Sequence, residues 1–284
     1  MKKRKNGSVW MVLPLYFFTI VFVVCPLIYM VALSFATPAR GAGVVWEFTL
    51  DNYKNILDPV YLDTFAQSLK LAVTSTVAIA LLGYPFGYFM ARLPDEKKSK
   101  VQLLLNLPFW VNSLIRLYGW IIILQKKGLL NFVLQKLGII EKPLSILYSY
   151  PAIVVGMIYV LLPFMILSVY SSAEKLDWSY VEAARDLGAS RLQAFWSVVF
   201  PLTLPGLLSG VILTFVPSMG LFFIADILGG NKVVLVGSLI QDQMTRGSNW
   251  PFAAALAVVM MVVTTILIML YRKITNAKEL EGIG

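Results

Sequence analysis

One acidic side chain, Asp226, lies within the long apolar stretches of this sequence. An ionisable group inside a membrane-spanning helix is costly unless it faces a partner, a cavity or water, so Asp226 is a candidate functional residue. Ser218 and Phe222 precede it at intervals of four residues, and on a continuous helix the three side chains share one face. A hydroxyl, a ring and a carboxylate in one line suit an elongated organic cation. The carboxylate would meet an ammonium group, and Phe222 and Phe223 would offer their ring faces.

The same stretch contains two residues that disturb a helix. Pro217 removes one backbone hydrogen bond and Gly220 follows closely, so we expect the helix to kink or open there. A plainer interpretation stays open, in which Asp226 caps a helix or pairs at the outer interface while Phe222 and Phe223 pack in the core or face lipid.

A second polar face is expected in the stretch before residue 124. Phe109, Asn112, Arg116 and Trp120 are separated by three, four and four residues, which is typical of one helix face. An unpaired arginine does not fit a pathway for cations, so we interpret Arg116 as a structural charge. We expect it to pair with Asp226 or with an acid of a partner subunit, or to donate to backbone carbonyls.

Trp110, Asn112 and Tyr118 complete the set of candidate pathway residues. The two aromatic residues are weaker candidates, because aromatic side chains near span ends are commonly anchors at the membrane surface.

The composition excludes several kinds of chemistry. The chain has no histidine and one cysteine, Cys25, so the sequence predicts no metal site, no disulfide and no Ser-His or Cys-His nucleophile. It also lacks the G-x-x-x-x-G-K-[ST] phosphate loop. We therefore expect no catalytic residues, no enzyme activity and no ATP-hydrolysing site in this chain.

Long apolar stretches must hold the candidate residues in place. Hydrophobic residues make up 58% of the 284 residues and the mean hydropathy is +0.77, which indicates an integral membrane protein. A helix needs about 20 mostly apolar residues to cross a bilayer. Six stretches meet this length: 9–35, 67–91, 101–124, 150–171, 203–228 and 251–271. The expected fold is all-α, with residues 1–284 forming a single transmembrane domain, and the first stretch is interpreted as a retained helix rather than a signal peptide.

The distribution of basic residues predicts the orientation. Lys and Arg near span ends remain in the cytoplasm. Fourteen of them lie at the two termini, between the second and third spans and in the polar segment 172–202, against eight in the other loops. Both termini and segment 172–202 are therefore expected in the cytoplasm. The net charge of +9 is spread along the span ends, which does not indicate nucleic-acid binding.

Segment 172–202 contains an amphipathic interruption, EAARDLGASRLQAFWSVVFP, between two spans. Ser179 with Glu182 and Ser190 with Gln193 have the spacing of reciprocal helix caps, and Gly188 between them permits a bend. The sequence predicts two short helices joined at an elbow, on which a soluble protein docks. A helix pair lying on lipid is the alternative, with interfacial anchors from Trp178, Phe195 and Trp196.

The pattern Glu182, Ala183, Ala184, three residues, Gly188, nine residues, Val198, one residue, Phe200, Pro201 resembles the EAA loop of type I ABC importer permeases. Their usual pattern ends in isoleucine, leucine and proline, so Val198 and Phe200 are departures. The resemblance implies that Glu182, Ala183, Ala184 and Gly188 meet a cytoplasmic ATPase. Small side chains at 183 and 184 allow close approach, and Glu182 offers a charge.

The stretches PFWVNSLIRLYGW, PSMGLFFIADILGG and NWPFAAA are similar to those of first-permease subunits in the spermidine/putrescine branch of that family. Many type I permeases carry glutamate directly after the glycine of the fifth span, whereas this chain has Leu221 after Gly220, and its acid is at Asp226.

The resemblance implies one half of an alternating-access pathway for polyamines in the bacterial inner membrane. It also implies four partners besides membrane lipid and the polyamine: a second homologous permease, two cytoplasmic ATPase subunits that bind ATP and Mg²⁺, and a periplasmic polyamine-binding protein. Two alternatives stay open: a type I permease for another small solute, and an ion-coupled secondary transporter.

Overall fold

The computed structural model describes residues 6–39, 43–230 and 232–274. The basic residues at positions 2–5, with Arg40 and Lys278, which enter the expected orientation, lie outside these ranges. Within them, six helical stretches are long and apolar enough to cross a membrane: 13–34, 59–91, 113–136, 150–173, 191–220 and 250–273. The all-α fold and the number of spans are thus confirmed.

The chain folds as two compact units. Unit 1 comprises residues 1–62 and 239–265, and unit 2 comprises residues 63–238 and 266–284. Unit 2 contains every candidate site residue and most of the buried core. The single-domain description of the chain stays a prediction.

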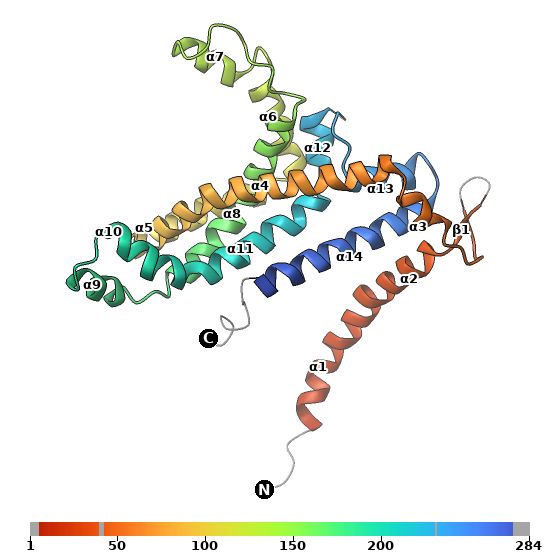
Figure 1. The fold of residues 1–284 in the computed structure, drawn as a ribbon, viewed down its shortest axis with the longest axis horizontal. Coiled ribbons are helices and arrows are strands. Elements are labelled where there is room, and N and C mark those ends of the chain that lie inside the picture. Colours follow the sequence, from red (N-terminus) through yellow and green to blue (C-terminus); the bar gives the residue numbers. More distant parts are fainter. Residues whose placement is uncertain (1–5, 40–42, 231, 275–284) are drawn as a thin grey trace. The chain divides into compact units, whose positions relative to one another are not determined.

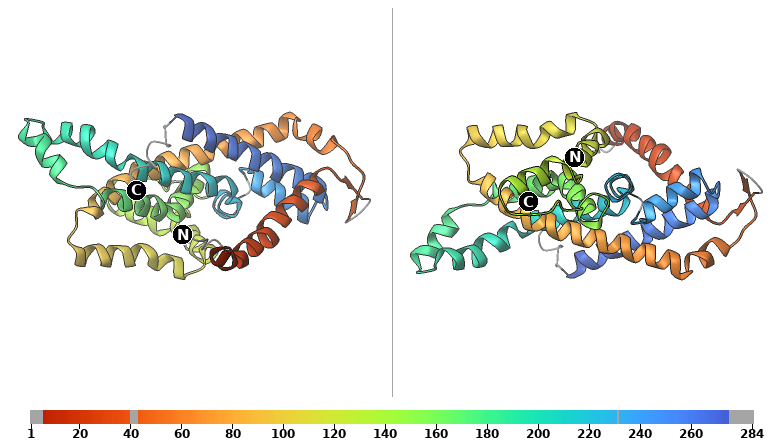
Figure 2. Two further views of the ribbon diagram at one scale, coloured as in Figure 1. Left: turned by 90° about the horizontal axis from the view of Figure 1, so that it is seen from below. Right: turned by 90° about the horizontal axis from the view of Figure 1, so that it is seen from above.

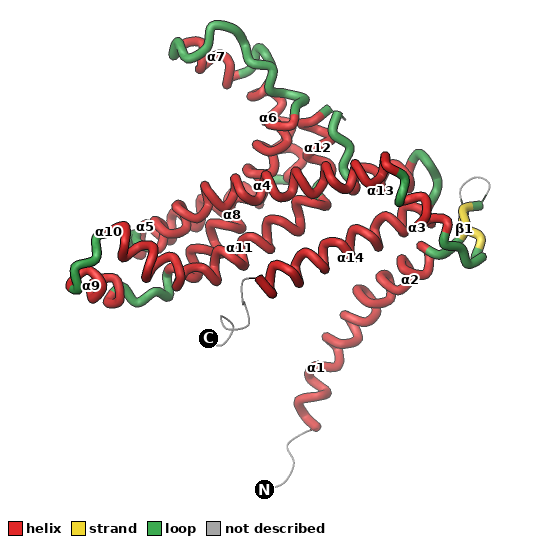
Figure 3. Tube along the Cα trace, viewed as in Figure 1, coloured by secondary structure: helices red, strands yellow, loops and turns green. Residues whose placement is uncertain are grey.

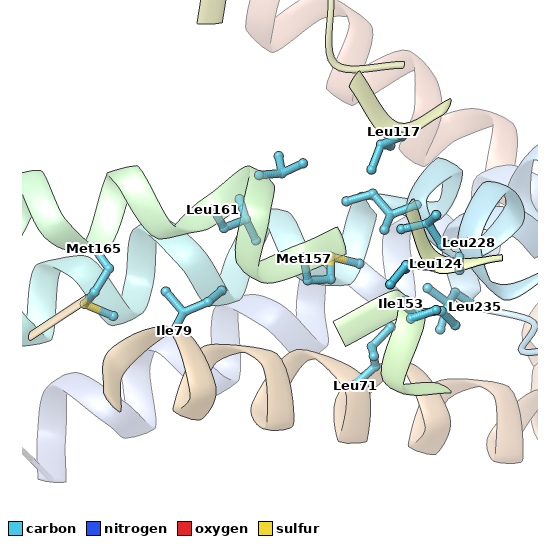
Figure 4. Close-up of a cluster of buried hydrophobic side chains, with 14 of the residues drawn as sticks. Leu71, Ile79, Leu117, Leu124, Ile153, Met157, Leu161, Met165, Leu228 and Leu235 are labelled. Carbon is cyan, nitrogen blue, oxygen red and sulfur yellow. The ribbon is translucent and has the colours of Figure 1, made fainter. Parts of the chain in front are cut away.

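Unit 2 is built around helix α8 (Tyr150–Ala173), which is apolar on all sides, as expected for a helix surrounded by others. Helix α4 (Pro59–Ala91) and helix α11 (Phe200–Gly220) lie along it (Figure 1), and Gly83 of α4 packs directly on Met165 of α8. The side chains that fill the core include Leu71, Ile79, Met157, Leu161 and Met165 (Figure 4). Lipid tails are as apolar as these side chains, so close van der Waals packing between the helices stabilises unit 2 inside a bilayer.

The predicted third span, 101–124, is not one continuous helix. Helix α5 (Asp95–Asn106) is followed by a 3₁₀ turn (Leu107–Trp110) and then by α6 (Ser113–Leu124), with extended backbone at Val111 and Asn112. Pro108 starts the disruption because it has no backbone N–H to donate. Helix α7 (Leu129–Lys136) continues beyond α6 and extends away from the other helices of unit 2 (Figure 1).

The predicted fifth span, 203–228, is also divided. Helix α11 ends at Gly220, Leu221 is non-helical, and α12 (Phe222–Gly229) begins a new helix. The opening expected after Pro217 is therefore present, and it is a complete break. Helix α12 packs closely on α8, since a Cβ atom at Gly156 would lie 2.5 Å from a methyl group of Leu228.

Between α8 and α11 lie α9 (Ser179–Asp186) and α10 (Arg191–Ala194), followed by a π-helical turn (Phe195–Val199). We call residues 177–199 the elbow. It projects past the end of α8 in both views of Figure 2. The π turn ends just before Pro201, where the Phe200 amide bonds the Phe195 carbonyl five residues back. A proline crowds the carbonyl four residues earlier, which favours a widened turn at this position.

Unit 1 contains α1 (Asn6–Thr19), a π-helical turn (Ile20–Val24) before Pro26, α2 (Cys25–Ser34), α3 (Asp51–Ile56) and most of α14 (Trp250–Ile274). Helix α13 (Val236–Thr245) runs from unit 2 into unit 1. An antiparallel strand pair, β1 (Thr37–Pro38) with β2 (Val44–Val45), follows α2 and is yellow in Figure 3. Buried Asn52 donates to the carbonyls of Ser34 and Ala36, both at 2.9 Å, which fastens α3 to the end of α2.

Candidate functional site

The bend of the elbow is a glycine-terminated helix end. Gly188 has φ +93°, a backbone conformation that side-chain-bearing residues rarely adopt. Its amide bonds the Arg185 carbonyl at 2.9 Å, and the Ala189 amide bonds the Ala184 carbonyl at 3.1 Å. This pair of bonds is a Schellman motif, which uses carbonyls that the end of α9 would otherwise leave free. The elbow expected at Gly188 is present, and its backbone is fixed by hydrogen bonds.

One of the two expected helix caps forms. The Ser190 hydroxyl accepts from the Gln193 amide at 3.3 Å, and the Gln193 side chain accepts from the Ser190 amide at 2.8 Å. The cap expected between Ser179 and Glu182 is wrong. Asp177 instead accepts the Ser179 amide at 3.0 Å, which lowers the pKa of the Asp177 carboxyl. Asp177 takes the amide that Glu182 was expected to bind, and Ser179 is the first residue of α9 rather than its cap.

The outer surface of the elbow exposes large apolar side chains. Leu187, at the bend, is 90% exposed, and Tyr180, Leu192 and Trp196 are exposed as well. Glu182 and Ala183 are also exposed, whereas Ala184 is half-buried. Several exposed apolar side chains on one structured projection are typical of an interaction surface. This surface offers a partner a leucine, small alanines and a carboxylate.

An aromatic cluster fastens the base of the elbow to α4. The Arg92 guanidinium lies over the rings of Trp178, at 5.2 Å, and Tyr88, at 5.8 Å. Tyr88 also meets Phe195 with ring centroids 5.6 Å apart. Trp178 precedes α9 and Phe195 follows α10, so both arms of the elbow contact α4. We call Arg92, Tyr88, Trp178 and Phe195 the joint.

A charged group near the joint connects α5 with α8. Lys98 lies 3.2 Å from Asp95 and 3.5 Å from Glu174. The hydrogen bond with Asp95 is the main cause that raises the pKa of Lys98. Glu174 also accepts from the Tyr170 hydroxyl. These contacts hold the segment that enters the elbow beside α5.

Asp226 lies on α12, half-buried, and accepts a hydrogen bond from the Ser238 hydroxyl at 2.9 Å. Ser238 is on α13, directly after the loop that follows α12. The bond uses Oδ1 of the carboxylate. A carboxylate oriented by one hydroxyl keeps acceptor capacity for a cationic ligand.

The stripe expected from Ser218, Phe222 and Asp226 is wrong as a single helix face. The break at Leu221 separates Ser218 on α11 from the other two residues on α12. Ser218 is buried and donates to the Phe215 carbonyl at 2.7 Å. Phe222 and Phe223 are half-buried with ring centroids 6.3 Å apart. Two rings and the carboxylate therefore remain together on α12, without the serine.

Arg116 makes no ion pair with Asp226 in the described part of the chain. Its guanidinium lies 5.3 Å from the centre of the Tyr159 ring and 5.8 Å from that of Phe109. Its buried Nε has no hydrogen-bond partner among the described residues. The expectation of pairing with Asp226 is therefore wrong within the chain. Instead of forming that ion pair, the guanidinium lies over two aromatic rings.

The remaining candidates have separate positions. Asn112 caps α6, because its Oδ1 accepts from the Leu114 amide at 2.8 Å. It is therefore not part of a continuous helix face with Phe109. Trp110 and Tyr118 are largely exposed, at 74% and 59%.

Sequence reasoning missed Tyr88, Arg92 and Tyr159. In the sequence Arg92 contributes only to the predicted orientation. Its position four residues after Tyr88, at a span end, is the pattern that could have indicated a cation–ring contact. Tyr159 lies in a uniformly apolar stretch, where nothing in the pattern distinguishes it.

Comparison with known proteins gives a consistent result. Residues 83–278 match the family model described as binding-protein-dependent transport system inner membrane component. The spermidine/putrescine transport system permease protein PotB of Escherichia coli (strain K12) is 42% identical over 266 residues, covering 92% of this chain and 97% of PotB. The protein of the same name from Haemophilus influenzae is 41% identical, covering 92% and 93% of the two chains.

A solved structure supports the fold. A chain from the crystal structure of a bacterial alginate ABC transporter, in complex with an alginate pentasaccharide-bound periplasmic protein, superposes with a TM-score of 0.77. The match covers 96% of this chain and 97% of the other, at 14% identity. At this identity the likeness concerns the fold.

Proposed function

Since the chain belongs to the family of binding-protein-dependent transport system inner membrane components, we propose that it is a pathway-forming permease subunit of an ATP-driven polyamine importer. The observation that carries this proposal is the elbow. It is a projecting, hydrogen-bonded bend with an exposed leucine, and its base is fastened to a membrane-spanning helix. The names of the relatives support spermidine and putrescine as substrates.

The elbow is the proposed docking element for an ATPase subunit. Glu182, Ala183, Ala184 and Gly188 meet the ATPase, with Leu187 entering its surface. The joint then carries movement of the elbow to α4, because Trp178 and Phe195 both contact Tyr88. A two-state rearrangement of this kind opens the pathway alternately to the two sides of the membrane.

Asp226, Phe222 and Phe223 are the proposed contacts of the polyamine on α12. The carboxylate neutralises an ammonium group, and the rings accommodate cationic or methylene segments. Ser238 orients the carboxylate from α13. Trp110, Asn112, Tyr118 and Ser218 remain candidates for other parts of the route.

The proposed assembly contains a second homologous permease, two ATPase subunits and a periplasmic polyamine-binding protein. ATP and Mg²⁺ bind the ATPase subunits, and this chain carries no cofactor of its own. Both termini and the elbow lie in the cytoplasm of a bacterium, and the chain crosses its inner membrane. Unit 1 holds a polar pocket of about 510 Å³, lined by residues that include Asp58, Tyr61 and Asn249.

Reconstitution of the complete assembly in proteoliposomes tests this function. Loaded binding protein is expected to raise ATP hydrolysis and to drive radiolabelled spermidine inward. ATP-dependent uptake of another solute, with none of spermidine or putrescine, would contradict the substrate. Uptake that follows a proton or sodium gradient without ATP would identify a secondary transporter instead.

A further inference from the structure

We propose that Phe109 and Tyr159 form a binding site for a substrate ammonium group, which the Arg116 guanidinium occupies as a tethered stand-in in this structure. The proposal rests on the proposed function, because it takes the substrate to be an organic polycation. It assigns this site in addition to the acid on α12.

The geometry is that of an aromatic cage around a cation. The guanidinium carbon of Arg116 lies 5.3 Å from the centre of the Tyr159 ring and 5.8 Å from that of Phe109. Further rings surround the two: Trp120 meets Tyr159 at 5.5 Å, and Phe164 meets Phe109 at 5.4 Å. Aromatic faces attract alkylammonium groups and guanidinium groups by the same quadrupole interaction.

Arg116 is held in the cage without an ion pair. Within the described ranges, its side chain lies beyond 4.0 Å of every carboxylate, and its buried Nε makes no hydrogen bond. Arg116 is half-buried, and an arginine inside a membrane-spanning helix in a structural role is normally paired or bonded to several acceptors. When an ammonium enters, the rings exchange one cation for another, and Arg116 leaves behind no paired acid among the described residues of this chain. Replacing the guanidinium by an organic cation therefore changes the free energy little. Replacing it by a neutral solute is unfavourable, because the rings would lose a cation.

The cage adjoins a groove that leads toward the elbow. Phe164, which packs on Phe109 of the cage, is also a wall of a groove of about 860 Å³ along α8 and α11. Serines line it at Ser168, Ser172 and Ser209, and its lining extends to Asp177 and Tyr180 of the elbow. Phe164 lines this groove and packs on Phe109, and both rings are partly exposed. A ligand in the groove would therefore lie one ring away from Phe109.

Direct binding by the complete transporter tests the site. The dissociation constant for radiolabelled spermidine is measured in lipid nanodiscs, without binding protein and without nucleotide, so that neither of them sets the affinity. Arg116→Met keeps a long apolar side chain and removes the tethered cation. It should tighten spermidine binding roughly fivefold to tenfold.

A double variant separates the cage from a general loss of positive charge. Arg116→Met with Tyr159→Leu should return the dissociation constant to about the wild-type value, because the vacated ring is gone. The matched control combines Arg116→Met with Phe86→Leu, which removes an exposed ring on α4. This double variant should bind spermidine as tightly as Arg116→Met does. The proposal is overturned if Arg116→Met does not tighten spermidine binding, or if binding stays tighter when Tyr159→Leu is added.

A folding defect is also decisive. Arg116→Gln is the second variant and should tighten binding in the same direction. If both Arg116 variants fail to assemble while Phe86→Leu assembles, Arg116 is structural and the proposal is wrong. If the wild type transports spermidine but neither Arg116 variant binds it more tightly, the cage is rejected and the proposed function stands. Absence of spermidine transport by the wild type rejects the proposed function itself.

Discussion

The guanidinium of Arg92, at the end of α4, lies 5.2 Å from the centre of the Trp178 ring at the start of the elbow. The two residues are 86 positions apart in sequence, and their contact links a membrane-spanning helix to the bend that we assign to ATPase docking. Tyr88 lies against both, so the contact is part of a packed cluster. Loosening this cluster should disconnect the elbow from α4.

Trp178→Ala should uncouple the transporter. The substitution removes the ring under Arg92, an interaction of about 0.5–2 kcal/mol, without altering any residue on the exposed outer surface of the elbow. Basal ATP hydrolysis should persist, while its stimulation by loaded binding protein and the uptake of spermidine fall several-fold. Trp178→Phe is the matched control and should retain most of both activities. Equal loss of assembly in the two variants would contradict a coupling role.

Gly188→Ala should strain the elbow. At φ +93° a Cβ atom costs about 1–2 kcal/mol, although no atom lies within 4 Å of its position. We expect weaker coupling and faster amide exchange at Leu187 and Ala189. Gly119→Ala is the control, since it also meets no atom within 4 Å and sits inside α6, where alanine favours the helix. Comparable effects of the two substitutions would argue against strain at the bend.

Asp226→Asn should reduce spermidine uptake about ten- to hundredfold, because it removes the charge that meets an ammonium group. The amide can still accept the Ser238 hydrogen bond, so the local structure is kept. Ser238→Ala keeps the carboxylate and should cause a much smaller loss. Uptake that is unaffected by Asp226→Asn would mean that the acid only supports the packing of α12 on α13.

The stability of the start of α9 should depend on pH through Asp177. The hydrogen bond from the Ser179 backbone lowers the folded-state pKa of Asp177 below its ordinary value of 3.8. A depressed carboxyl pKa stabilises the folded state above the ordinary value, and this contribution disappears as the pH falls through the folded-state pKa. Relative to wild type, Asp177→Asn should therefore speed amide exchange in α9 at neutral pH. The difference should shrink as the pH falls below the ordinary value and through the lowered folded-state pKa of Asp177. A difference of equal size at all pH values would exclude the charge as its cause.

Much of this architecture could be predicted from the sequence because it depends on local patterns. Six apolar stretches give six spans, and the spacing of Ser190, Gln193 and Gly188 gives the bend and one of its caps. The predicted cap between Ser179 and Glu182 is wrong because Asp177 accepts the Ser179 amide that the Glu182 side chain was to bind. Local spacing alone does not decide between two capping residues.

The candidate site was harder to predict because its residues depend on where helices stop. A proline and a glycine indicated a disturbance before Leu221 but not that the helix would end there, so Ser218 was placed on the wrong face. The sequence predicts that Arg116 pairs with Asp226 or an acid of a partner subunit, or donates to backbone carbonyls. In the described chain it does not pair with Asp226, and its guanidinium lies over the ring of Tyr159, which is distant in sequence. Pairings of this kind come from the packing of α6 on α8, which no periodicity within either helix reports.

The most direct test of the central claim is photocrosslinking from the tip of the elbow. A photoreactive residue replaces Leu187, which is 90% exposed, in the assembled transporter in its native membrane. The same residue at Leu137, exposed at the end of α7, is the control. We predict a covalent adduct with the ATPase subunit from position 187 and none from position 137. Adducts from position 187 with lipid alone would contradict the assignment of the elbow as the element that docks the ATPase.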